Sequence, residues 1–182
     1  MNILTRKKIN CDKYIDLIDD LNISQILSSF HYQEYHILDT SRVYVNYPFG
    51  YDVNYGDLYV YMVYTKMTKD VILEEFIIKA YIALNKDYYI EFQKDSFIKS
   101  IKDSIKVYFD TSVIPIKKEE IKIQFQQWFN DAELEKLNIN FSKIKESAYI
   151  GEIDFYDEVG YQGFISFVAD DKIYFVNFIS NI

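Results

Sequence analysis

Residues 148–179 read AYIGEIDFYDEVGYQGFISFVADDKIYFVNFI, and this stretch decides the fold class. Its residues follow a period of two along three runs, 148–156, 163–169 and 172–179. Residues that favour turns separate the runs, at Glu158 to Gly163 and at Asp170-Asp171. A period of two is typical of strands, and short turns between strands favour antiparallel neighbours. The stretch therefore predicts a three-stranded antiparallel meander.

Further strands are predicted upstream. Residues 34–47 have the pattern of a hairpin with its turn at Asp39-Thr40-Ser41, because these residue types tolerate turns. Residues 58–65 are dense in Tyr and Val and predict another strand. A short strand is expected over residues 88–93. The sequence thus predicts strands at both ends of the chain, with most of the helices between them.

Apolar residues spaced three and four apart predict the helices. A break in the first helix is expected near Asn22. The residues predicted to cap the N-termini of later helices are Thr68, Asp95 or Ser96, and Asp131. For residues 117–130 a strand is an alternative to the helix, because apolar residues alternate there. The predicted helices cover residues 12–30, 70–85, 95–109, 117–130 and 131–137.

The composition is that of a folded domain with a high aromatic content. Hydrophobic residues make up 49% of the 182 residues and charged residues 26%, which argues against disorder. The chain has 18 Tyr and 14 Phe, enough for a large core. We predict an α+β fold: a single domain over 1–182, whose antiparallel sheet combines N-terminal strands with the C-terminal three-stranded meander and packs against about four helices.

The N-terminal residues and the single cysteine indicate the cellular compartment in which we expect the protein. No apolar stretch of secretory length follows the basic residues of Met1 to Asn10, and no window is long and apolar enough to span a membrane. Cys11 stands alone, so the chain forms no internal disulfide and no thiolate zinc site. We expect a cytoplasmic protein that does not bind a membrane.

The net charge of −8 comes from two acidic blocks. Acids greatly outnumber bases in residues 11–60 and again in residues 146–182, whereas the segment between them is nearly balanced. If both blocks lie on one side of the fold, they repel nucleic acid and attract a basic partner. The one candidate for a phosphate-binding face is lysine-rich, and a solvated face balanced by neighbouring acids is the better interpretation. Its residues are Lys94, Lys99, Lys102 and Lys106.

The sequence lacks the motifs of common catalytic and cofactor sites. No Gly-x-Ser-x-Gly elbow, glycine-rich phosphate loop or Gly-x-Gly-x-x-Gly fingerprint is present. His31, Glu34 and His36 form the one histidine cluster, but their spacing on a strand or a helix does not converge on a metal. Carboxylate pairs are abundant in so acidic a chain and carry little information. We expect no enzyme activity, no metal site and no cofactor.

Two surfaces combine acids with tyrosines and are the predicted partner-binding sites. The first surrounds the turn of the meander, with Glu152, Asp154, Tyr156, Asp157, Glu158 and Tyr161. The second is the loop of residues 47–57, with Tyr51, Asp52, Tyr55 and Asp57. Tyrosine anchors interfaces because it offers area and a hydroxyl at low entropic cost. The alternative is that these tyrosines pack back on the sheet.

These observations predict a small acidic inhibitor that binds a basic protein, such as a toxin or a nuclease-like enzyme. In size and charge the chain resembles immunity proteins and antitoxins, although no motif identifies a family. A phage-type inhibitor of a host defence enzyme has the same composition. The alternative from a different class is a small-molecule-binding protein or enzyme with a pocket of Tyr hydroxyls and carboxylates between sheet and helices. A third is a self-associating protein that uses aromatic strand edges.

Overall fold

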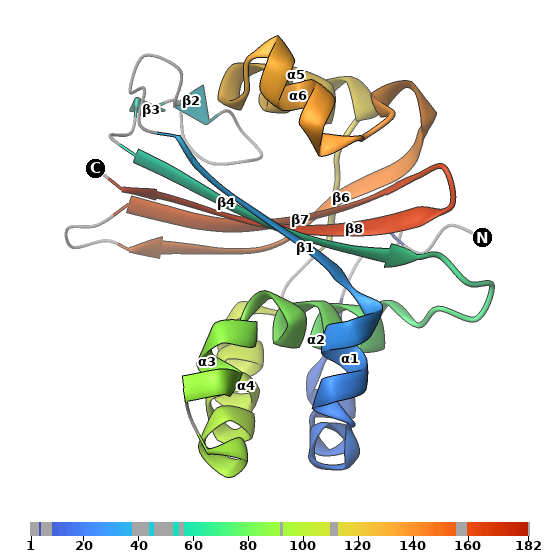
Figure 1. The fold of residues 1–182 in the computed structure, drawn as a ribbon, viewed down its shortest axis with the longest axis vertical. Coiled ribbons are helices and arrows are strands. Elements are labelled where there is room, and N and C mark those ends of the chain that lie inside the picture. The colour runs from blue at the N-terminus through green and yellow to red at the C-terminus, as the bar shows by residue number, and fades with distance from the viewer. Residues whose placement is uncertain are drawn as a thin grey trace.

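A single central sheet organises the chain. The computed structural model describes residues 4, 9–37, 44–45, 53–54, 57–91, 93–109, 113–155 and 160–181. Six antiparallel strands form the sheet in the order β1-β4-β8-β7-β6-β5 (Figure 1). They are β1 (His31–Ile37), β4 (Asp57–Lys66), β5 (Ile114–Pro115), β6 (Ile144–Phe155), β7 (Gly160–Ala169) and β8 (Lys172–Asn181). The α+β class and the C-terminal meander of β6, β7 and β8 are confirmed.

Helices cover both faces of the sheet. Figure 1 shows α1 to α4 on one face, and α5 and α6 on the other. The α-helices are α1 (Ile23–Ser29), α2 (Leu73–Leu84), α3 (Lys86–Glu91), α4 (Lys94–Tyr108), α5 (Lys118–Trp128) and α6 (Asp131–Leu137). Two 3₁₀ helices, η1 (Asp12–Asp20) and η2 (Phe141–Lys143), complete the helical part of the described chain. No helix among the described residues is long and apolar enough to cross a membrane.

The predicted N-terminal hairpin is wrong. β1 pairs along its whole length with β4, from His31 opposite Tyr64 to Ile37 opposite Leu58. The strand β2 (Tyr44–Val45) pairs instead with β3 (Val53–Asn54) in a separate two-stranded sheet. β1 pairs with the long strand β4 because each cross-strand pair of residues contributes to stability, and β4 offers a partner to every residue of β1. β4 also pairs with β8, so strands from the two ends of the sequence share one sheet.

The predicted strand over 88–93 is also wrong, because residues 86–91 form helix α3. The amide nitrogens of Tyr88 and Tyr89 donate to the backbone carbonyl of Asn85, which starts a new helical turn directly after α2. Tyr88 and Ile90 are exposed by 58% and 78%, so the apolar run does not mark a buried strand. This additional helix, the division of residues 12–30 into two and the short 3₁₀ helix η2 explain why helices exceed the predicted number.

The predicted break near Asn22 is confirmed, and three predicted caps are wrong. The Asn22 side chain accepts a hydrogen bond from the backbone nitrogen of Gln25 and starts α1. Asn130 rather than Asp131 caps α6, with Glu133 completing a capping box. The residues that precede α2 and α4 are Ile72 and Gln93, so neither Thr68 nor Asp95 or Ser96 is a cap. Helix α5 (Lys118–Trp128) lies within residues 117–130, so the strand alternative for this segment is wrong.

A separate apolar cluster packs on each face of the sheet. On one face, Phe164 and Phe175 pack with Ile77 of α2 and Phe97 of α4. On the other, residues of α5 pack on alternate positions of the same strands, and the rings of Trp128 and Phe178 lie 5.2 Å apart. The high aromatic content therefore serves the core on both faces.

Candidate functional site: a pocket between α4 and the polar half of the sheet

One face of the sheet changes from apolar to polar along its strands. Near α2 this face presents Val63, Phe164 and Phe175, which are fully buried. Two residues further along β4 and β8 the same face presents Tyr61 and Asn177. Because side chains alternate between faces with a period of two, these polar residues lie in line with the apolar core. Helices cover the apolar half more closely than the polar half.

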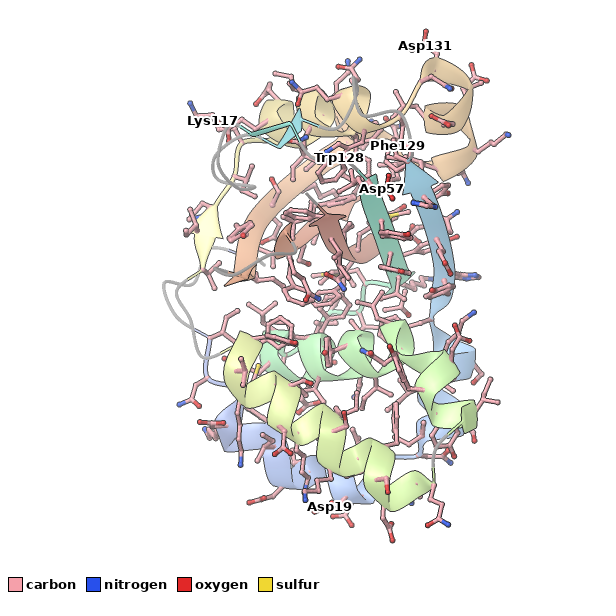
Figure 2. All side chains as sticks on the ribbon, turned by 90° about the vertical axis from the view of Figure 1, so that its left-hand side faces the viewer. Asp19, Asp57, Lys117, Trp128, Phe129 and Asp131 are labelled. Carbon is pink, nitrogen blue, oxygen red and sulfur yellow. The ribbon has the colours of Figure 1, made fainter. Side chains whose placement is uncertain are left out.

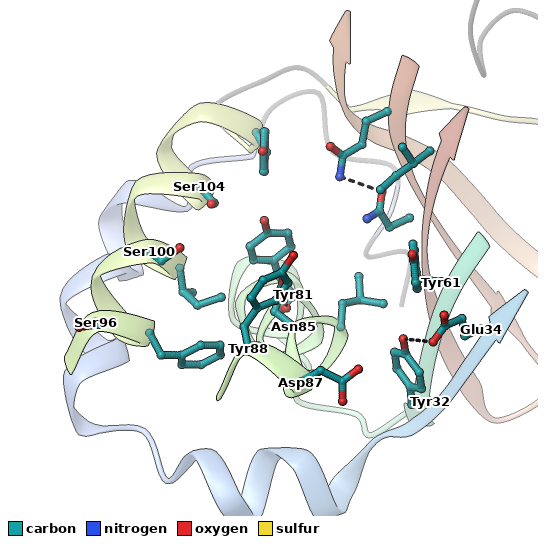
Figure 3. Close-up of a pocket in the computed structure, with 17 residues that line it drawn as sticks. Tyr32, Glu34, Tyr61, Tyr81, Asn85, Asp87, Tyr88, Ser96, Ser100 and Ser104 are labelled. Atoms are coloured by element: carbon teal, nitrogen blue, oxygen red, sulfur yellow. Dashed lines mark hydrogen bonds between the residues drawn. The ribbon is translucent and has the colours of Figure 1, made fainter. Parts of the chain in front are cut away.

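A pocket of about 790 Å³ lies between this polar half and helices α2, α3 and α4 (Figure 3). On the sheet side, Glu34, Tyr61 and Asn177 are direct cross-strand neighbours on β1, β4 and β8. The sheet lines the pocket with Tyr32, Glu34, Tyr61, Gln162, Asn177 and Ile179.

Three helices supply the opposite wall. Ser96, Ser100 and Ser104 are spaced four residues apart on α4, so all three lie on the face of the helix that lines the pocket (Figure 3). From α2 and α3 come Tyr81, Leu84, Asn85, Asp87 and Tyr88, and α4 adds the apolar or aromatic residues Phe97, Ile101 and Tyr108. The wall thus combines hydroxyls and an amide with aromatic rings.

Two amide side chains meet at the sheet side of the pocket. Gln162 Nε2 donates to Asn177 Oδ1 over 3.1 Å, and each residue is only 8% exposed. This bond uses one donor and one acceptor. The NH₂ group of Asn177 and the Oε1 atom of Gln162 have no hydrogen-bond partner within the described part of the chain. A donor and an acceptor therefore remain side by side in the pocket.

Tyrosines around the pocket stay protonated at neutral pH. Burial raises the pKa of Tyr81 to about 12, although hydrogen bonds to Ser104 and Asn85 act in the opposite direction. Burial, and then the charge of Glu34, raise the pKa of Tyr61. The pKa of Tyr32 is raised by burial and by Glu34, whose Oε2 accepts the Tyr32 hydroxyl over 2.9 Å. These phenols therefore act as neutral donors and acceptors.

A cation already lies beside one ring of this site. The ammonium of Lys86, the first residue of α3, lies 3.8 Å from the centroid of the Tyr32 ring. This distance is that of a close cation–π contact. The hydroxyl of the same ring donates to Glu34, so Tyr32 contacts both the ammonium of Lys86, which does not line the pocket, and the carboxylate of Glu34, which does.

Four of the predicted partner-binding residues belong to described strands. Glu152 and Asp154 belong to β6, opposite Gly163 and Tyr161 of β7. Their register positions alternate with that of Ile153, whose partner Gln162 lines the pocket. The remaining predicted residues, Tyr51, Asp52, Tyr55, Tyr156, Asp157 and Glu158, lie outside the described residues. The structure therefore gives the register positions of Glu152, Asp154 and Tyr161, and the partner-binding role of the set stays a prediction.

Asp57 begins β4, and its Oδ2 lies 3.5 Å from His36 Nε2. Figure 2 shows Asp57 beside the sheet and Asp19 at the outer end of the helical layer formed by η1 and α4. Both belong to the first acidic block, so these two acids of the block lie on different parts of the molecule. Asp19 also pairs with Lys102 of α4 over 2.6 Å. One lysine of the α4 face, Lys102, is therefore paired with an acid of η1.

The histidine cluster is divided between ring contacts. His31 stacks on Tyr64 with centroids 4.7 Å apart, and His36 stacks on Tyr59 at 4.0 Å. Within the described ranges, no group of three His, Cys, Asp or Glu residues is placed to hold a metal ion. The two imidazoles thus belong to cross-strand aromatic pairs.

Sequence reasoning missed the pocket residues, although two local signals point to them. The serines of α4 recur every fourth residue, which marks a polar stripe on one helix face. Gln162 and Asn177 interrupt strands that are otherwise rich in apolar residues. Neither signal shows that the two elements face each other.

Comparison with known proteins found no match. No family model, no curated protein and no solved structure matches the chain. The geometry of the pocket and the charge of the chain are therefore the observations from which a function follows.

Proposed function

We propose that this protein binds a small polar molecule in the pocket between α4 and the sheet. The observation that carries the proposal is the Gln162–Asn177 pair, two amides 8% exposed with a donor and an acceptor left over. Buried polar groups cost free energy unless they are hydrogen-bonded. The two amides satisfy part of this need in each other. Their left-over donor and acceptor are not among the fully buried unpaired atoms of the described residues, so they are open to the pocket, where a ligand can complete their hydrogen bonds.

The size and lining of the pocket support the same function. Its volume of about 790 Å³ falls in the range of ordinary ligand sites. Aromatic and aliphatic side chains provide contact area, and a few polar groups provide direction. The described lining contains hydroxyls, amides and carboxylates but no imidazole, amine or thiol, so no serine there has a neighbouring imidazole or amine as its base. This lining favours binding rather than catalysis.

A pocket-filling substitution tests the proposal. Ser100→Trp adds a large ring from α4 into the pocket without removing a core side chain. Val107→Trp is the matched control, because Val107 lies on the same helix, is 69% exposed and does not line the pocket. A library of small polar fragments is screened by ligand-observed NMR against wild type and both variants. We expect fragments that bind wild type and Val107→Trp but not Ser100→Trp.

Two results of this screen contradict the proposal. One is a set of bound fragments that Ser100→Trp leaves unchanged, which places binding elsewhere. The other is the absence of any bound fragment from wild type. Circular dichroism of each variant establishes that the fold is retained.

We also propose, on the basis of charge, that the protein inhibits a basic protein partner. The net charge of −8 and its concentration in two blocks support this second function, since such charge accelerates association with a basic surface. The test is capture of a basic protein from the native lysate by wild type and by the triple variant Asp154→Lys, Asp157→Lys, Glu158→Lys. We expect a basic partner that wild type retains at low salt and the variant loses. Equal retention by both baits contradicts a role for these acids.

A further inference from the structure

We infer that the ligand of the pocket is a small organic cation with an apolar or aromatic body. This inference rests on the proposed function of the pocket as a small-molecule site. It identifies the ligand by charge: among the described residues, the lining contains the carboxylates of Glu34 and Asp87 and no Lys, Arg or His.

Among the described residues, no ion pair neutralises the two carboxylates. No Lys or Arg nitrogen of the described chain lies within ion-pair distance of Glu34 or Asp87. Glu34 accepts the Tyr32 hydroxyl, which orients the carboxylate without cancelling its charge. The chain as a whole carries a charge of −8, which adds to the negative potential. An anionic ligand is therefore disfavoured and a cation favoured.

Aromatic rings provide the second component of a cation site. Tyr61, Tyr81, Tyr88 and Tyr108 line the pocket together with Tyr32. The faces of such rings attract ammonium groups, and the attraction grows when the group is shielded from water. Phe97 and Ile101 add apolar surface along α4, where the uncharged part of a ligand packs.

Lys86 shows that this lining accepts an ammonium. Its Nζ lies 3.8 Å from the centroid of Tyr32, next to the hydroxyl that contacts Glu34. The protein's own side chain thus makes the contact that we assign to a ligand cation. If a ligand cation uses the same ring, Lys86 competes with it, and removal of the Lys86 charge strengthens ligand binding.

Three probes that share an indole ring test the role of charge. Tryptamine carries an ammonium, tryptophol a neutral hydroxyl and indoleacetate a carboxylate, so charge is the main variable. Isothermal titration calorimetry at low salt measures each affinity for wild type. We expect tryptamine to bind roughly tenfold more tightly than tryptophol, a preference between the values for exposed and for shielded cation–π contacts, and indoleacetate to bind least. Equal affinities for tryptamine and tryptophol, or no binding of tryptamine, overturn the inference.

The Ser100→Trp variant separates this inference from the proposed function. If tryptamine and tryptophol bind equally and Ser100→Trp abolishes both, the pocket binds small molecules without preference for a cation. If tryptamine binds Ser100→Trp as it binds wild type, the pocket is not the site and both proposals fail.

Two charge substitutions sharpen the test. Glu34→Gln keeps an acceptor for the Tyr32 hydroxyl but removes the negative charge. We expect it to lower the affinity for tryptamine about fivefold and to leave the affinity for tryptophol unchanged. Lys86→Gln is expected to raise the affinity for tryptamine about threefold. Lys79→Gln is the control for loss of a positive charge, because Lys79 pairs with Glu75 on α2, and neither residue lines the pocket. A Lys86→Gln effect no larger than that of Lys79→Gln contradicts competition at Tyr32.

Discussion

The two faces of the central sheet use the same strands for different purposes. On β8, Phe178 lies in the apolar cluster beneath α5, whereas the adjacent Asn177 lines the pocket on the other face. On β7, Phe167 is buried under α5, and Gln162 hydrogen-bonds Asn177. The face beneath α5 is apolar where the opposite face becomes polar. The difference teaches that one face of the sheet carries a continuous apolar core, whereas the other combines an apolar core with a polar pocket.

The largest effect is expected from the apolar face. Trp128 of α5 is completely buried against Phe178. Trp128→Ala should lower the free energy of unfolding by about 3–5 kcal/mol, because it removes a large buried side chain and leaves a cavity. Urea denaturation measures the change. A loss below about 1 kcal/mol shows that this face contributes less to stability than its packing indicates.

A smaller loss is expected where a strand position admits no side chain. A Cβ atom at Gly163 lies within 2.9 Å of three ring carbons of Phe178, which is itself fully buried. Gly163→Ala should therefore cost about 1–3 kcal/mol through overpacking. The thermal midpoint gives the measurement. Unchanged stability would mean that the Phe178 ring moves aside freely.

Alkaline pH tests the burial of tyrosine at the edge of the pocket. Burial raises the pKa of Tyr81 from 10.0 to about 12. Because the folded state holds the proton more tightly than the unfolded state, this contribution is complete below pH 10 and disappears as pH rises toward 12. Stability should fall by up to about 1.4 kcal/mol per pH unit in this window.

Tyr81→Phe is the control for this pH dependence, since it keeps the ring and removes the ionisable group. The variant should show a shallower alkaline decline in urea denaturation than wild type. Identical slopes for the two proteins would assign the decline to other groups, such as Tyr174 on the opposite face, whose pKa burial also raises to about 12.

The smallest effect is expected at the outer surface of the helical layer. Asp19 and Lys102 form an ion pair of 2.6 Å, but the Asp19 side chain is 59% exposed. Water and salt screen such a pair, so Asp19→Asn should change stability by less than about 1 kcal/mol. Chemical denaturation at low and high salt measures the change. A larger, salt-insensitive loss would indicate that η1 is held to α4 mainly by this contact.

Local periodicity predicted much of the fold. The meander and α4 follow continuous patterns over many residues, and the pattern alone specifies such elements. The position of β4 between β1 and β8 depends on pairing between residues far apart in the sequence, which no local pattern contains. Residues 88–90 resemble a strand because they are apolar, yet Ile90 is 78% exposed on α3. Apolar character without burial misled the prediction there.

The candidate site was less accessible to sequence reasoning. The sequence suggested, as an alternative function, a pocket of tyrosines and carboxylates between sheet and helices. It did not indicate which residues line that pocket. Tyr32, Tyr81 and Gln162 come from three elements that the fold brings together. The acids of the meander were predicted as a binding site because they are clustered in the sequence. Glu34 and Asp87 are far apart in the sequence, and the fold places both in the lining of the pocket.

The central claim is that Gln162 and Asn177 serve a ligand rather than the stability of the sheet. The most direct test is the double variant Gln162→Leu, Asn177→Leu, studied by urea denaturation and by NMR with the fragments that Ser100→Trp displaces. We predict an unfolding free energy that is unchanged or higher by about 1 kcal/mol, because both partners of a buried hydrogen bond are replaced together, and loss of fragment binding. A fall of about 2 kcal/mol or more, or fragments that still bind, would contradict the claim.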